Sequence, residues 1–129
     1  MKVLVVDDDQ YIQRMYGRTM QLESVEVIGI NEGTQAVETA KREKPDIILM
    51  DVMMPKMNGL DALRALKASD ETKDIPVIML SAYEEEALLL NAINSGASMY
   101  LLKSDFEPQQ IVDILKETVE SIKKPDQQK

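Results

Sequence analysis

The chain has 129 residues, 44% hydrophobic and 29% charged, which is typical of one globular domain with one sizeable core. Its 23 acidic and 15 basic side chains give a net charge of −8, which disfavours nucleic acid and anionic membranes because both are bound through cations. The absence of Cys and His excludes disulfides, thiol nucleophiles, histidine triads and Cys or His metal sites, so any metal must be a hard cation held by oxygen.

Short apolar runs alternate with helical patterns along the chain. Strands are expected over residues 3–6, 25–30, 47–50, 76–80 and 99–102. Apolar side chains at three- and four-residue spacing predict helices over residues 12–20, 34–44, 60–66, 84–94 and 108–122. Five strand-then-helix units predict an α/β fold in which a doubly wound, five-stranded parallel sheet has helices on both faces.

One domain is expected over residues 1–123, followed by a polar C-terminal tail over residues 124–129. No apolar run approaches the roughly 20 residues of a membrane span, and the run after Lys2 is too short for a signal peptide. The sequence therefore predicts a soluble, cytoplasmic domain that neither enters a membrane nor binds nucleic acid directly.

Polar side chains follow the predicted strands where each one ends. Asp7 and Asp8 follow the first strand, Asp51 the third, Ser81 the fourth and Lys103 the fifth. Ligands of doubly wound sheets bind outside the carboxyl ends of the strands. The architecture therefore predicts that these side chains lie along one rim of the sheet.

If Asp7, Asp8 and Asp51 lie together on this rim while ionised, a cation is needed to offset their repulsion. Two carboxylates about 4 Å apart repel by about 4 kcal/mol at an effective dielectric constant near 20. An oxygen-only site with open positions suits Mg²⁺, beside which a carboxylate can attack phosphorus while Lys103 and Ser81 bind the transferred group. Taken singly, each aspartate is equally explained as a turn former or helix cap, and Tyr100 as a core aromatic. Only the complete set of strand-end residues favours a site.

The motifs VLVVDDD, PDIILMDVMMPKMNGLDALRALK, IPVIMLSA and SGASMYLLKSDF occur in this order. Over residues 2 to about 122 the chain resembles the receiver domains of two-component response regulators, most closely the single-domain chemotaxis type. The resemblance implies a flavodoxin-like sheet with strand order 2-1-3-4-5. It also implies a phosphorylation-dependent signalling switch that relays its state through protein–protein contacts.

By this resemblance, Asp51 is the phosphoacceptor, which takes a phosphoryl group from a sensor histidine kinase or a phosphotransfer protein. Asp8 would be a direct Mg²⁺ ligand, with Asp7 assisting, and Asp51 and the backbone carbonyl of Met53 would complete the protein ligands. The domain would catalyse its own phosphorylation and dephosphorylation and would not be an enzyme in the ordinary sense.

The resemblance also assigns a conformational switch. Ser81 matches the switch hydroxyl, Tyr100 the aromatic that turns inward on activation, and Lys103 the lysine of the site. A downstream protein would bind the face formed by the fourth helix, fifth strand and fifth helix. Ser104 stands where the family usually has a proline after a cis peptide bond, so this bond is either a strained cis bond or trans. Bulky Met53 and Tyr83 are expected to shield the acyl phosphate from water.

Three alternatives remain open. A phosphatase of the haloacid-dehalogenase type also uses an aspartate nucleophile and Mg²⁺, and Asp7 and Asp9 supply its two acids, but Tyr11 replaces its Thr or Val. A flavodoxin-type cofactor binder is disfavoured, because three aspartates after the first strand would repel the phosphate of FMN. In a structural interaction module, the acids would only keep the surface soluble.

Overall fold

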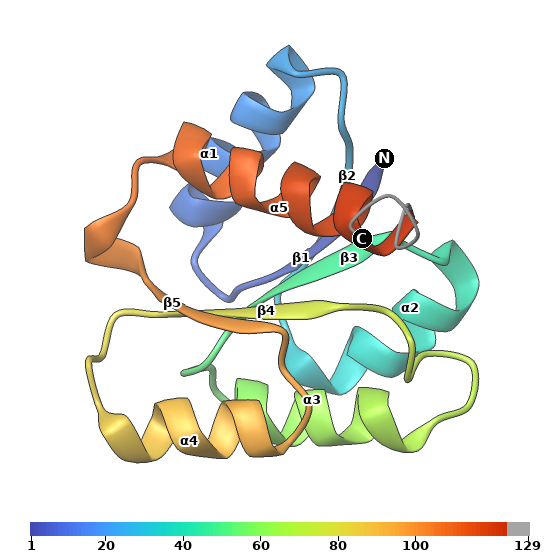
Figure 1. Cartoon of the computed structure of the whole chain (residues 1–129), viewed down its shortest axis with the longest axis vertical. Coiled ribbons are helices and arrows are strands. Elements are labelled where there is room, and N and C mark those ends of the chain that lie inside the picture. The colour runs from blue at the N-terminus through green and yellow to red at the C-terminus, as the bar shows by residue number, and fades with distance from the viewer. Residues whose placement is uncertain (124–129) are drawn as a thin grey trace.

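Five strands alternate with five α-helices in the computed structural model, which describes residues 1–123 (Figure 1). The strands are β1 (Lys2–Val6), β2 (Glu26–Ile30), β3 (Ile47–Asp51), β4 (Val77–Ser81) and β5 (Met99–Leu102). The α-helices are α1 (Gln10–Leu22), α2 (Ala36–Glu43), α3 (Gly59–Ala68), α4 (Glu86–Asn94) and α5 (Pro108–Lys123). Short 3₁₀ turns cover Gly33–Gln35 and Lys103–Asp105. The predicted tail over residues 124–129 lies outside the described residues.

The strands form one parallel sheet in the order β2-β1-β3-β4-β5, which confirms the predicted fold class and strand order. Helices α1 and α5 cover one face, and α2, α3 and α4 cover the other (Figure 1). Because β1 lies between β2 and β3, the strand order reverses beside β1. That reversal places the end of β1 next to the end of β3, where doubly wound folds bind ligands.

The central strands are apolar because both of their faces are covered. Successive side chains of a strand point to opposite faces, so Val3 and Val5 of β1 pack under α1 and α5, whereas Leu4 and Val6 pack over α2 and α3. All four of these side chains are buried. This two-sided core fixes the strands rigidly and thereby fixes the positions of the polar residues at their carboxyl ends.

The element boundaries differ slightly from those expected. The third and fourth strands extend one residue further, so that Asp51 and Ser81 are the last residues of their strands. Helix α4 begins at Glu86, two residues later than predicted, because the backbone of Tyr83 is hydrogen-bonded to Ser81 and Tyr100 and Glu85 is extended. None of the helices within residues 1–123 is long and apolar enough to cross a membrane.

Candidate functional site

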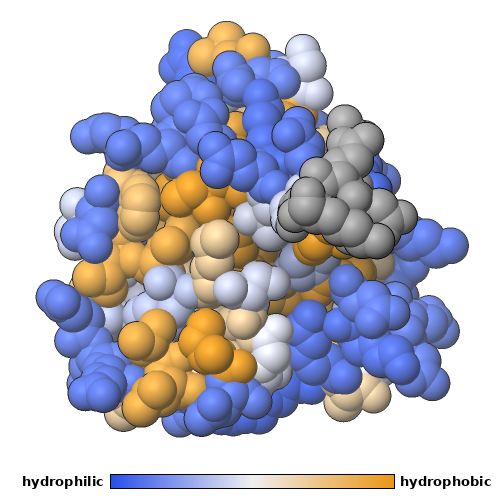
Figure 2. Space-filling model, in the orientation of Figure 1, coloured by the Kyte–Doolittle hydropathy of each residue, from blue (hydrophilic) through white to orange (hydrophobic). Residues whose placement is uncertain are grey.

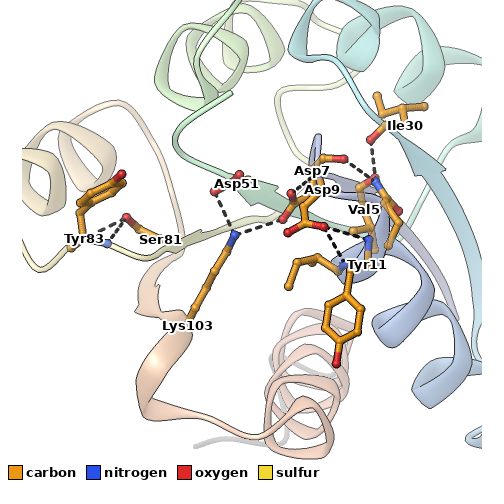
Figure 3. A network of polar contacts seen from close by, with 11 residues as sticks. Val5, Asp7, Asp9, Tyr11, Ile30, Asp51, Ser81, Tyr83 and Lys103 are labelled. Atoms are coloured by element: carbon orange, nitrogen blue, oxygen red, sulfur yellow. Dashed lines mark hydrogen bonds and ion pairs between the residues drawn. The ribbon is translucent and has the colours of Figure 1, made fainter. Parts of the chain in front are cut away.

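Three carboxylates and one ammonium group meet at the carboxyl ends of β1, β3 and β5. Figure 3 shows two of these carboxylates, those of Asp7 and Asp51, with Lys103. Asp7, Asp8 and Asp51 each offer a carboxylate oxygen within 4.8 Å of the others. The Nζ atom of Lys103 lies 3.3 Å from Oδ2 of Asp7 and 3.4 Å from Oδ1 of Asp51. The predicted convergence of these four residues is confirmed.

The loop after β1 holds its aspartates in different environments. Asp7 is buried, and its Oδ1 atom accepts a hydrogen bond from the backbone N–H of Asp9 at 2.9 Å. Asp8 is exposed. The carboxylate of Asp9 caps α1 by accepting from the N–H groups of Tyr11 and Ile12. The site is therefore built from Asp7 and Asp8, while Asp9 stabilises the helix that follows.

Lys103 reaches the carboxylates without a cis peptide bond. The described residues contain none, so the bond between Lys103 and Ser104 is trans. The short 3₁₀ turn that begins at Lys103 follows directly on β5, and the side chain crosses the end of the sheet toward β1 and β3 (Figure 3). Of the cis and trans bonds that the sequence left open, the trans bond is observed. It still places the Nζ atom of Lys103 within 3.4 Å of Oδ1 of Asp51.

Burial and crowding disturb the protonation of the site. Burial, with the neighbouring charge of Asp7, raises the pKa of Asp51 to about 6, although Lys103 opposes this rise. Burial also raises the pKa of Asp7. For Lys103, burial would lower the pKa, but Asp51 and Asp7 together outweigh it, so its pKa is raised. Near neutral pH the site therefore holds more negative charge than one ammonium group can neutralise.

A second polar group links β4 to β5. Ser81 is buried, and its hydroxyl accepts from the backbone N–H of Tyr83 at 2.9 Å and donates to the Tyr83 carbonyl at 3.4 Å (Figure 3). The Tyr100 hydroxyl donates to the same carbonyl at 2.9 Å. Tyr100 is half-buried and packs against the layer of α2, α3 and α4. Thus Ser81 lies at the predicted strand end, and its hydroxyl is bonded to the loop that Tyr100 holds.

The two bulky residues beside the rim are largely exposed. Met53 and Tyr83 each have an exposed fraction of 52%. Met53 belongs to the loop between β3 and α3, where Asn58 caps the helix and Gly59 follows. A Cβ atom on Gly59 would overlap the backbone carbonyl of Asp51, so glycine lets α3 begin directly against the end of β3. This close approach fixes the backbone of Asp51.

Sequence reasoning missed one pair of residues near the site. The side chain of Gln13, in α1, hydrogen-bonds to backbone carbonyls at the ends of β1 and β2. Gly29 lies in β2, and a Cβ atom there would overlap the side-chain oxygen of Gln13. The available signal was a glycine inside a strand pattern, which marks a close approach of another group.

Comparisons with known proteins agree on one family. Residues 3–116 match the response regulator receiver domain family. The chemotaxis protein CheY of Thermotoga maritima is 36% identical over 115 residues, which cover 88% of this chain and 93% of that protein. A crystal structure of the Vibrio cholerae chemotaxis protein CheY4 has a TM-score of 0.83 and 30% identity, with 90% of this chain and 96% of that chain covered.

Longer regulators are similar as well. The DNA-binding response regulator MtrA of Mycolicibacterium paratuberculosis is 34% identical over 111 residues, or 86% of this chain and 48% of that protein. The chain thus spans about half the length of the MtrA relatives. By the match over most of its length and by its fold, the chain belongs to the response regulator receiver domain family of two-component systems.

Proposed function

We propose that the protein is a phosphorylation-dependent switch in which Asp51 accepts a phosphoryl group from a histidine kinase or a phosphotransfer protein. The observation that carries this proposal is the cluster itself: a buried carboxylate at the end of β3, two further carboxylates within 4.8 Å, and an ammonium group 3.4 Å away. Acidic side chains crowded at a sheet's ligand-binding edge are costly for stability, which indicates that they serve binding and chemistry.

The oxygen donors fit Mg²⁺. Three carboxylates can surround a small divalent ion, and Asp8 on the exposed side leaves it accessible to phosphate oxygens. We assign Asp8, Asp51 and the backbone carbonyl of Met53 as ligands, with Asp7 assisting. When bound, the ion supplies positive charge that offsets the repulsion among the carboxylates and draws in phosphate oxygens.

Phosphoryl transfer then uses the chain's own side chains. A carboxylate oxygen of Asp51 attacks phosphorus, the P–N bond of the donor phosphohistidine breaks, and the departing imidazole nitrogen keeps the electron pair and takes up a proton. Lys103 is placed to bind a phosphoryl oxygen of the resulting acyl phosphate. Water later attacks the same phosphorus, which releases inorganic phosphate and restores the Asp51 carboxylate. The domain thus promotes both its own phosphorylation and its own dephosphorylation.

The switch follows from the added charge and its three acceptor oxygens. Ser81 at the end of β4 exchanges its bonds to Tyr83 for a bond to the phosphoryl group. The loop after β4 then shifts. Tyr100, whose hydroxyl donates to the Tyr83 carbonyl before phosphorylation, turns inward. Phosphorylation in this way biases an equilibrium between two packings of the same residues.

The partner surface is the face made by α4, β5 and α5. Figure 2 shows apolar surface over α4, and three of the helix's large apolar side chains are exposed: Leu89, Leu90 and Ile93. Tyr100 lines a groove on this face, so its movement changes the groove's shape. Four acids also line the groove, namely Glu84, Glu85, Glu86 and Asp105. A downstream protein with apolar and basic side chains fits this surface.

The test is phosphorylation by acetyl phosphate with Mg²⁺, followed by mass measurement of the intact protein. We expect one added phosphoryl group on the wild type and none on Asp51→Asn. Asp9→Asn is the matched control, because asparagine also caps helices well, and it should be labelled like the wild type. Labelling of Asp51→Asn would mean that another residue is the phosphoacceptor. Loss of labelling in Asp9→Asn as well would mean that the loss in Asp51→Asn is not specific to the acceptor.

A further inference from the structure

One side chain of α1 joins the ends of two strands. The Nε2 atom of Gln13 lies within hydrogen-bond distance of three backbone carbonyl oxygens: Val5 at 3.1 Å, Asp7 at 3.1 Å and Ile30 at 2.7 Å. Val5 and Asp7 lie at the end of β1, and Ile30 is the last residue of β2 (Figure 3). An amide group has two N–H donors, and all of its donating capacity is directed at these carbonyls.

The contact with Asp7 bears directly on the carboxylate site. The carbonyl group of Asp7 belongs to the planar peptide unit that joins the Cα atoms of Asp7 and Asp8. Fixing this carbonyl therefore restricts the positions of both Cα atoms and the directions in which their side chains leave the backbone. β1 ends at Val6, and just beyond it the backbone N–H of Asp7 still donates to the Ile30 carbonyl at 3.1 Å. The Gln13 amide holds the next peptide unit, through the carbonyl of Asp7.

The strand opposite Gln13 is shaped to admit its side chain. A Cβ atom on Gly29 of β2 would overlap the Oε1 atom of Gln13 and lie 3.1 Å from its Cδ atom. The φ angle of Gly29 is not positive, so the backbone does not demand glycine there. The absence of a side chain at Gly29 is instead explained by the space that the Gln13 amide occupies.

We propose that Gln13 is a positioning residue for the metal-binding pair Asp7 and Asp8, with Gly29 providing the room that it needs. The assignment rests on the proposed function, since it takes Asp7 and Asp8 as the residues that hold Mg²⁺. Gln13 touches neither the ion nor the phosphoryl group. It acts by holding the peptide between the two acids.

The experiment measures Mg²⁺ affinity by calorimetric titration, at a temperature where every variant is folded, together with the Tm of the metal-free protein. Gln13→Met keeps the length of the side chain and removes its donors, and we expect Mg²⁺ affinity to fall about tenfold. Gly29→Ala displaces the amide without altering it and should lower the affinity about threefold. In the double variant, Gly29→Ala should add nothing, because the amide that it displaces is already absent.

Two matched controls are available in α1. Gln21→Met is the control for Gln13→Met, because Gln21 is exposed. Gly17→Ala is the control for Gly29→Ala, because a Cβ atom on Gly17 would meet nothing within 4 Å. Both should bind Mg²⁺ like the wild type.

Two outcomes would overturn the assignment. If Gln13→Met and Gly29→Ala bind Mg²⁺ like the wild type while their Tm falls, Gln13 only braces the fold. If Gln13→Met does not fold, unchanged affinity in Gly29→Ala alone decides against the assignment. Failure of the wild type itself to bind Mg²⁺ would overturn the proposed function as well, which distinguishes the two failures.

Discussion

The two ends of the sheet differ in how their charged side chains are paired. At the amino ends of the strands, the Nζ atom of Lys2 lies 3.8 Å from Glu26 and 3.7 Å from Glu43. Asp46 accepts from the Lys2 backbone N–H at 2.7 Å and pairs with Lys123 at 3.6 Å. Each of these three carboxylates, those of Glu26, Glu43 and Asp46, therefore has a cation or a donor. The arrangement stabilises the fold modestly and requires no ligand.

At the carboxyl ends, Asp7 and Asp51 share the ammonium group of Lys103, and a carboxylate oxygen of Asp8 lies within 4.8 Å of theirs. Asp7 and Asp51 are buried, and burial increases the cost of every unneutralised charge. The proposed Mg²⁺ site accounts for the excess of carboxylates over cations at this end, whereas the pairs at the amino ends require only each other.

The largest expected effect comes from breaking the carboxyl-end cluster. Lys103→Met removes the ammonium group and leaves Asp7 and Asp51 facing each other. Removing one partner of a buried ion pair costs about 3 to 5 kcal/mol, and because the lysine side chain is 25% exposed we expect the lower value, about 3 kcal/mol at pH 7. Urea denaturation of the metal-free protein measures this loss.

The control for this variant is Lys123→Met, which breaks an exposed pair at the opposite end. It should lower the free energy of unfolding by less than about 0.5 kcal/mol, because the Lys123 side chain is 61% exposed. Equal losses in the two variants would contradict the comparison.

Much of this contrast could be predicted from the sequence. Parallel strands end at one edge of the sheet, so the position of Asp7, Asp8, Asp51 and Lys103 at strand ends was enough to bring them together. The hydrogen bonds that side chains form beyond the strand ends depend on which nearby donors and acceptors compete for them. Nothing in the sequence showed that Ser81 would bond to the backbone of Tyr83.

The role of Gln13 was equally hidden, whereas the capping role of Asp9 was one of the alternatives that the sequence left open. The amide of Gln13 finds its three carbonyls only because α1 crosses the ends of β1 and β2 at that distance. Asp9 is chemically identical to its two neighbours, yet it caps α1 because it immediately precedes the helix. Tertiary geometry decided the role of Gln13, whereas the role of Asp9 follows from its place in the chain.

The second prediction concerns pH. The folded-state pKa of Asp51 is about 6, above its ordinary value of 3.8, so between these pH values the folded protein binds more protons than the unfolded one. Stability contributed by protonated Asp51 is therefore full below about pH 4 and is lost as pH rises through about 6. We expect a loss of about 2 kcal/mol, below the roughly 3 kcal/mol given by the two pKa values, because solvent screens the charge.

The measurement is the difference in unfolding free energy between the wild type and Asp51→Asn, without Mg²⁺, at about pH 4.5 and about pH 7. The variant should gain relative to the wild type at the higher pH, and adding Mg²⁺ should remove most of that gain by stabilising the wild type. Asp70→Asn, whose parent side chain is 95% exposed, should show no such difference. If the difference in unfolding free energy between the wild type and Asp51→Asn did not change with pH, folding would not raise the pKa of Asp51.

The third prediction addresses the exposed rim. Met53 and Tyr83 flank the proposed acyl phosphate, and we expect them to keep water from its phosphorus. In Met53→Asn combined with Tyr83→Ala, loss of the phosphoryl group should be about tenfold faster, which corresponds to about 1.4 kcal/mol in the barrier. Intact mass followed over time after removal of acetyl phosphate measures this rate. Equal or slower loss would exclude a shielding role.

The smallest effect is expected at the amino ends. Lys2→Met removes two long ion pairs and a hydrogen bond to the Glu43 carbonyl, while methionine keeps the apolar contacts of the stem. We expect a loss of about 1 kcal/mol in urea denaturation. Because these ion pairs lie at the opposite ends of the strands from the proposed metal site, the loss should be the same with or without Mg²⁺. A loss that changed with Mg²⁺ would couple the two ends of the sheet, and the carboxyl-end cluster could then no longer be treated as an independent unit.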